Sequence, residues 1–294
     1  MLPGWIVWKK IMNGPIVSRV WGLVLLVPVV ASAWPPARLP PARSVAYGPD
    51  PRQCMDVYPP PSPDLAPAVK APMLVLVHGG GWRTGDKDSR AVVAAKQAHW
   101  GQQQGWLVVS VNYRLLPAAT VAQQAGDLAT ALVQIQQQAP RWGGDPQRLV
   151  LMGHSAGAHL VTLLATAPQW LHPQPAPWRA TVALDSAAYD VPSLMQGRHL
   201  PLYDQAFGTQ PIHWPSLSPQ QQLHQPLRPF LAVCSTQRPD QPCAQAAAFV
   251  QAARQFGSTA TLLPVALSHR AINAELGQPG PYTAAVDQFL QTIP

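Results

Sequence analysis

The sequence predicts an α/β protein, with a mostly parallel central sheet covered by helices on both faces. Two observations support this class. Apolar runs of strand length alternate with helical segments through most of the chain, and a glycine-rich turn containing a serine stands between one such run and a helix. The chain has 294 residues, of which 47% are hydrophobic and 11% charged. These values indicate a single folded domain with a sizeable core and argue against a disordered chain.

The regular alternation starts after a proline-rich arm, residues 34–67, in which irregular chain and edge strands are expected. Buried strands are predicted at 73–77, 106–111, 149–152, 180–184, 230–233 and 261–265, and helices at 121–138, 244–256 and 282–290. Between 191 and 228 the pattern gives way to Pro, Gln, His and Leu. This stretch is either a small cap-like insertion or a low-complexity surface loop.

The N-terminus has the pattern of an export signal. Three basic residues precede the apolar run 20–30, and residues 31–33 read Ala-Ser-Ala, an A-x-A cleavage site. We expect residues 1–33 to be a cleaved signal peptide and residues 34–294 to form the mature domain. The product would be periplasmic or secreted, with no stable membrane partner after cleavage. An uncleaved membrane anchor is the alternative.

Charge excludes one class of partner. The net charge is +7, but the basic residues are spread along the chain and form no cluster interleaved with aromatic residues. The sequence therefore predicts no nucleic-acid binding.

Export permits disulfides, and the chain has three cysteines. Cys234 and Cys243 flank a short loop after a predicted strand, so we expect them to pair; two reduced thiols are the alternative. Cys54 is then left over. No C-x-x-C pattern occurs, and neither a metal nor an organic cofactor is predicted.

The most informative pattern is G-x-S-x-G at residues 153–157. A predicted strand precedes it and a predicted helix follows it. In that setting the turn is sharp and strained, and the hydroxyl of Ser155 is exposed at the edge of the sheet. A glycine-rich turn with a passive serine is the alternative.

A second glycine motif, His-Gly-Gly-Gly-Trp at residues 78–82, follows the first central strand. A backbone with three glycines can fold tightly and point N–H groups outward, where they can stabilise an oxyanion. Alone the motif could be a flexible loop. Its place one strand and one helix before Ser155 makes the two motifs support each other.

With these segments the chain is similar to α/β-hydrolases of the esterase/lipase group, close to hormone-sensitive-lipase-like carboxylesterases, feruloyl-type esterases and kynurenine formamidase-like enzymes. The matching segments are residues 78–87, 111–115, 143–146 and 153–160. The resemblance covers about residues 45–294. It implies the α/β-hydrolase fold with a cap-like insertion at about 191–228.

The resemblance also implies a triad in the chain order serine, acid, histidine. His269 is the one histidine that follows the last predicted strand, so it is the expected base for Ser155. Asp240 follows the strand where this group places its acid, and we take it as the acid; its loop lacks the usual G-x-x-D. Asp185, after the preceding strand, is the alternative. Asp190 and Asp204 are the other carboxylates between Ser155 and His269.

Other polar residues near the motifs are expected to have structural roles. His78 should orient the glycine loop, and Asp145 should shape the turn before strand 149–152. His154 occupies the variable place of the serine turn. His159 should pack within its helix or line a pocket, because its spacing from His154 does not suit a helical metal site.

The function that follows is that of an exported serine hydrolase, which cleaves small carboxylic esters through an acyl-enzyme on Ser155. The N–H groups of Gly80, Gly81 and Ala156 would form the oxyanion hole. An amide hydrolase and a non-catalytic hydrolase-like binding protein are the alternatives. The oligomeric state cannot be predicted.

Overall fold

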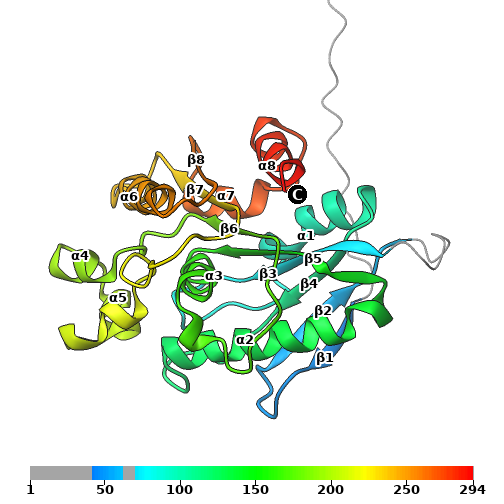
Figure 1. Ribbon diagram of the computed structural model, residues 1–294, viewed down its shortest axis with the longest axis horizontal. Helices are drawn as coiled ribbons and strands as arrows, with labels where there is room; N and C mark the ends of the chain where they lie inside the picture. The colour runs from blue at the N-terminus through cyan, green and yellow to red at the C-terminus, as the bar shows by residue number, and fades with distance from the viewer. Residues whose placement is uncertain (1–41, 62–69, 294) are drawn as a thin grey trace, which may run out of the picture. The chain divides into compact units, whose positions relative to one another are not determined.

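The computed structural model describes residues 42–61 and 70–293 of the protein. Within them, eight strands form one sheet in the order β1-β2-β4-β3-β5-β6-β7-β8 (Figure 1). β1 and β2 pair antiparallel at one edge, and the strands from β4 to β8 run parallel. The strands are β1 (Arg43–Ala46), β2 (Cys54–Tyr58), β3 (Ala71–Val77), β4 (Leu107–Val111), β5 (Gly144–His154), β6 (Ala180–Leu184), β7 (Phe230–Ser235) and β8 (Ala260–Val265).

The helices of the main layers are α1 (Arg90–Lys96), α2 (Val121–Gln138), α3 (Ala156–Thr166), α6 (Pro242–Gln255), α7 (His269–Glu275) and α8 (Pro281–Gln291). A π-type helix, η1 (Gln97–Gln103), continues α1, and short 3-10 turns, η2 (Ala139–Trp142) and η3 (Pro168–Trp170), follow α2 and α3. The predicted strands and helices are all present. α1 and α7 were not predicted from the sequence, because both helices are only seven residues long.

Alternation of side chains along the central strands produces two hydrophobic layers. Val75 of β3 is buried on the face that packs against Leu128 of α2 and Leu160 of α3. Leu76, the next residue, is buried on the opposite face, in a cluster with Ile272 of α7. Figure 1 shows α2 and α3 on one side of the sheet and α1 and α8 on the other. Burial on both faces explains why these strands read as continuous apolar runs.

The proline-rich arm contributes the edge of the sheet. β1 and β2 lie within it, and β2 pairs with β4, so the expectation of edge strands is confirmed. The predicted signal peptide, residues 1–33, lies outside the described residues. None of the helices that the structure describes is long and apolar enough to cross a membrane.

The segment between β6 and β7 is a compact helical insertion. It contains α4 (Val191–Gln196), α5 (Pro201–Phe207) and two 3-10 turns, η4 (Pro211–His213) and η5 (Pro215–Leu217). His159 of α3 contacts this insertion. The Nε2 of His159 is hydrogen-bonded to the carbonyl oxygen of Leu217 at 2.8 Å. The buried ring of His159 also packs edge-on against Phe207 of α5. His159 therefore packs its helix against the insertion, one of its two expected roles.

Parallel strands bring their carboxyl ends to the same edge of a sheet, which is where α/β proteins commonly bind ligands. Here β3 leads into the glycine loop and β5 into Ser155. β6 leads into Asp185, and β8 leads into His269. The topology thus gathers the chemically interesting segments at one edge.

A disulfide joins Cys234, at the end of β7, to Cys243, at the start of α6, with a sequence separation of nine residues. This confirms the predicted pairing. Cys54 is the free thiol and is half-buried. The disulfide closes the loop that contains Arg238 and Asp240.

We expect the double variant Cys234→Ala/Cys243→Ala to have a free energy of unfolding about 2–3 kcal/mol lower than that of the native protein, because the cross-link restricts the unfolded chain. Urea unfolding followed by circular dichroism measures this difference. Cys54→Ala is the matched control, with an expected change within about 0.5 kcal/mol. Equal stabilities of the double variant and the control would show that the disulfide does not stabilise the fold.

Candidate active site

Ser155 lies on a strained turn between β5 and α3. Its backbone has φ 56° and ψ −118°, outside the regions that non-glycine residues usually adopt. The amide of Ser155 donates a hydrogen bond of 2.8 Å to the carbonyl oxygen of Leu184 at the end of β6. This bond extends the sheet ladder by one residue and fixes the turn, which presents the side chain at the sheet edge.

Two glycines allow the backbone to come this close. At Gly157 a Cβ atom would overlap the carbonyl oxygens of Val77 and His78 at the end of β3. At Gly79 a Cβ atom would lie 2.9 Å from the Cβ of Ser155. The glycine loop after β3 and the serine turn after β5 are therefore in direct contact.

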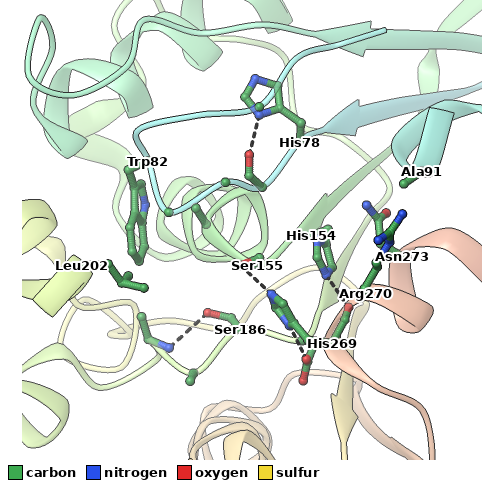
Figure 2. A pocket seen from close by; sticks show the side chains of 18 of the residues that line it. His78, Trp82, Ala91, His154, Ser155, Ser186, Leu202, His269, Arg270 and Asn273 are labelled. Atoms are coloured by element: carbon green, nitrogen blue, oxygen red, sulfur yellow. Dashed lines mark hydrogen bonds and ion pairs between the residues drawn. The ribbon is translucent and has the colours of Figure 1, made fainter. Parts of the chain in front are cut away.

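The structure brings Ser155, His269 and Asp185 into one hydrogen-bonded row. The Oγ of Ser155 lies 3.0 Å from the Nε2 of His269, and a dashed line in Figure 2 marks this contact. The Nδ1 of His269 lies 2.5 Å from the Oδ2 of Asp185. With Nδ1–H donating to the carboxylate, Nε2 is left as an acceptor for the hydroxyl of Ser155. This is the tautomer that a histidine base requires.

Asp185 is fully buried but well satisfied. Its Oδ1 accepts a hydrogen bond of 2.8 Å from the amide of Ser235, and its Oδ2 accepts from His269 and from Arg238. Burial alone would raise the pKa of Asp185. The hydrogen bonds from His269 and Ser235, together with the charge of Arg238, outweigh burial and hold the pKa below its ordinary value. Asp185 is therefore ionised at neutral pH.

The expectation that Asp240 contacts the histidine is wrong. Both carboxylate oxygens of Asp240 engage Arg238, the Oδ1 through the Nε at 2.9 Å and the Oδ2 through the Nη2. The side chain that turns from this loop toward His269 is Arg238. Asp185 reaches His269 because it leaves β6 with φ 58°, which redirects the chain at the strand end.

His154 bonds to the backbone of His269, a role that its place in the serine turn did not predict. Its Nε2 donates to the backbone carbonyl oxygen of His269 at 2.9 Å, and the two rings lie 4.5 Å apart (Figure 2). Burial lowers the pKa of His154 to about 3, so the ring is neutral and can hold this bond at ordinary pH. The identity of the residue at the variable place of G-x-S-x-G was the only signal in the sequence.

The glycine loop is oriented as expected. The Nδ1 of His78 is hydrogen-bonded to the carbonyl oxygen of Gly79 at 2.7 Å, and its ring stacks on Tyr113. Asp145 lies within β5 and not in a turn before it, and its Oδ1 accepts a bond of 2.9 Å from the amide of Gln147. His78 therefore supports the loop by packing rather than by facing Ser155.

Ser155 opens into a cavity of about 690 Å³. Gly80, Gly81 and Ala156 line it, so the three predicted oxyanion-hole residues border the same space as the serine. In the view of Figure 2, Trp82 and Leu202 lie on one side of Ser155, and Asn273 and Arg270 lie on the other. Leu202 belongs to the insertion, which therefore forms part of the cavity wall.

Among the residues that the structure describes, no group of three or more His, Cys, Asp or Glu side chains is placed to hold a metal ion.

Comparison with known proteins shows that the chain is similar to esterases. The family model BD-FAE matches residues 55–172. The chain is 30% identical over 227 residues to esterase LipQ of Mycobacterium tuberculosis, covering 73% of this chain and 53% of LipQ. It is 32% identical over 138 residues to the isoprenylcysteine alpha-carbonyl methylesterase ICME of Arabidopsis thaliana, covering 46% of this chain and 30% of ICME. The chain thus spans about half the length, or less, of these curated relatives.

Among solved structures, the native esterase Est2 of the planctomycete Thermogutta terrifontis superposes with a TM-score of 0.69 at 23% identity, covering 87% of this chain and 93% of Est2. The protein therefore has the α/β-hydrolase fold. The sequence relatives are similar to the chain over part of their own length, and they include esterase LipQ and the probable carboxylic ester hydrolase LipM, both of Mycobacterium tuberculosis.

The close approach at Gly157 can be tested directly. We expect Gly157→Ala to lower the free energy of unfolding by more than about 3 kcal/mol, because the new methyl group meets backbone that cannot move aside. Gly126 of α2 is the matched control, since a Cβ there meets nothing within 4 Å. Gly126→Ala should instead stabilise the protein by about 1 kcal/mol. Similar unfolding midpoints for the two variants would contradict the packing described for the serine turn.

Proposed function

We propose that the protein is a serine hydrolase of carboxylic esters, acylated on Ser155. The observation that carries this proposal is the row formed by Ser155, His269 and Asp185, with contacts of 3.0 Å and 2.5 Å. A serine hydroxyl is a weak nucleophile until a positioned base removes its proton. The row supplies that base together with an ionised acid that fixes its tautomer.

The reaction follows from the positions of these groups. Ser155 Oγ attacks the ester carbonyl carbon while His269 Nε2 takes its proton, and Asp185 stabilises the resulting imidazolium. His269 then returns the proton to the leaving alcohol, and the acyl group stays on Ser155. Water repeats the sequence on the acyl-enzyme and releases the acid.

The tetrahedral intermediate carries a negative charge on the former carbonyl oxygen. The amide groups of Gly80, Gly81 and Ala156 are our candidates for its donors, because all three residues border the cavity next to Ser155. Each such donor is worth about 3–4 kcal/mol of the activation barrier. The position of Ala156 as the first residue of α3 supports this assignment, since the first amides of a helix have no partner within the helix.

The direction of proton transfer orients the substrate. The leaving oxygen must face His269 Nε2, so the alcohol part should occupy the side of Arg270 and Asn273. The acyl part then lies toward Trp82 and Leu202, the apolar side of the cavity in Figure 2. Residues of the insertion would thereby help to select the acyl chain.

Relatives support ester chemistry: LipQ is named an esterase and ICME a methylesterase. We further propose that the enzyme is exported, on the basis of the predicted signal peptide at residues 1–33 and the disulfide between Cys234 and Cys243. Disulfides persist in oxidising compartments.

The test is hydrolysis of p-nitrophenyl esters from acetate to palmitate. We expect the native protein to be active and Ser155→Ala to fall to the uncatalysed background. Asp185→Asn should lower kcat by about 10⁴, because it favours the wrong tautomer of His269. Asp240→Asn should lower kcat by less than about tenfold, since it acts at a distance from the reacting atoms.

Two outcomes would contradict the proposal. Folded native protein that cleaves no ester would exclude an esterase, and aryl formamides and amides would then be the next substrates. A larger loss for Asp240→Asn than for Asp185→Asn would show that the acid is Asp240 and would overturn the assignment.

A further inference from the structure

The guanidinium cation of Arg238 contacts two members of the proposed triad. The Nη1 of Arg238 donates to the Oδ2 of Asp185 at 3.0 Å and to its carbonyl oxygen at 3.1 Å. The same nitrogen lies 3.1 Å from the Nδ1 of His269. Both nitrogens carry hydrogen and face one carboxylate oxygen, so Arg238 and His269 share the same acceptor.

The positive charge of Arg238 opposes catalysis unless a negative charge compensates it. In the proposed reaction His269 becomes a cation, and a neighbouring guanidinium disfavours that charge. If Arg238 were free to form a bidentate pair with Asp185, it would also weaken the hydrogen bond between Asp185 and His269. Bidentate pairing is the preferred geometry of arginine and carboxylate.

The carboxylate of Asp240 supplies the compensating negative charge. It occupies the Nε and Nη2 edge of Arg238, which leaves only Nη1 for Asp185. The side chain of Arg238 is 15% exposed, so its interaction with Asp240 is partly shielded from water. All three guanidinium nitrogens of Arg238 are engaged by the two aspartates, which argues against a role in anchoring substrate.

We propose that Asp240 is a positioning residue that holds and neutralises Arg238, so that Asp185 stays available to His269. The inference rests on the proposed function, in which His269 is the base. It also assigns a role to the carboxylate in the loop where the family resemblance implied the acid itself.

Other groups around His269 set the background against which the pair acts. Asp185 follows β6, and His154 ends β5. Tyr203 of α5 and Arg270 of α7 line the cavity, and the charge of Lys96 of α1 acts on His154. Burial keeps His154 neutral and raises the pKa of Tyr203. Burial lowers the pKa of Lys96 to about 7, so Lys96 titrates in the working range. All variants share these groups, and differences between variants therefore report on the pair.

The experiment is the pH dependence of kcat/KM for p-nitrophenyl acetate, in which the acid limb reports protonation of the base. Asp240→Asn should move the acid limb to lower pH by about 0.5–1 unit and lower kcat about fivefold, because an unbalanced Arg238 disfavours the imidazolium. Arg238→Met should move the acid limb to higher pH. In the Arg238→Met background, Asp240→Asn should cause little further shift, since its effect passes through Arg238.

Two variants serve as controls. Asp240→Glu keeps the charge and should restore the native acid limb. Asp145→Asn removes the same charge at the start of β5, the opposite end of that strand from Ser155, and should leave the profile unchanged. If Arg238→Met does not fold, Arg238→Gln replaces it as the background for Asp240→Asn.

NMR titration of the His269 imidazole gives a readout that needs no turnover, with His269→Gln used to assign the signal. A shifted midpoint in Asp240→Asn that disappears in the Arg238→Met background supports the proposal. An unchanged midpoint, or the same shift with and without Arg238, overturns it. If the native protein cleaves no ester, the proposed function fails, while the NMR titration still decides how Asp240 affects His269.

Discussion

The site depends on a hydrogen-bond ladder that continues beyond the ends of the central strands. The amide of Ser155 donates to the carbonyl oxygen of Leu184, and the amide of Asp185, the next residue, donates to the carbonyl oxygen of Val233, both at 2.8 Å. These two bonds carry the parallel register of β5, β6 and β7 into the turns. They fix the serine relative to the carboxylate before any side chain is placed.

Much of the fold and part of the site could be predicted from the sequence. Parallel strands buried on both faces give long apolar runs, and the glycines around Ser155 are required by backbone contacts that only one residue type satisfies. The acid could not be chosen in this way. Asp185 and Asp240 follow neighbouring strands and both obey the chain order, so the outcome depended on backbone direction at Asp185, where φ is 58°. His154 was missed because a bond to a backbone carbonyl oxygen leaves no pattern in the sequence.

In the loop between β7 and α6, the charged side chains near His269 are paired with opposite charges. It is tied by the disulfide between Cys234 and Cys243, and it sends a guanidinium rather than a carboxylate toward His269. The guanidinium contacts Asp185 on one edge and Asp240 on the other, so the buried negative charge and the nearby positive charge are each compensated. Buried charges are tolerated in proteins only when they are paired in this way.

The central claim is that Ser155 is a nucleophile activated through His269 and Asp185. The most direct measurement is covalent labelling with a fluorophosphonate, followed by mass spectrometry of the modified peptide. The account predicts one adduct per chain on Ser155 and a labelling rate at least about 100-fold lower in Asp185→Asn. No adduct on the folded protein, or an equal rate in Asp185→Asn, would contradict it.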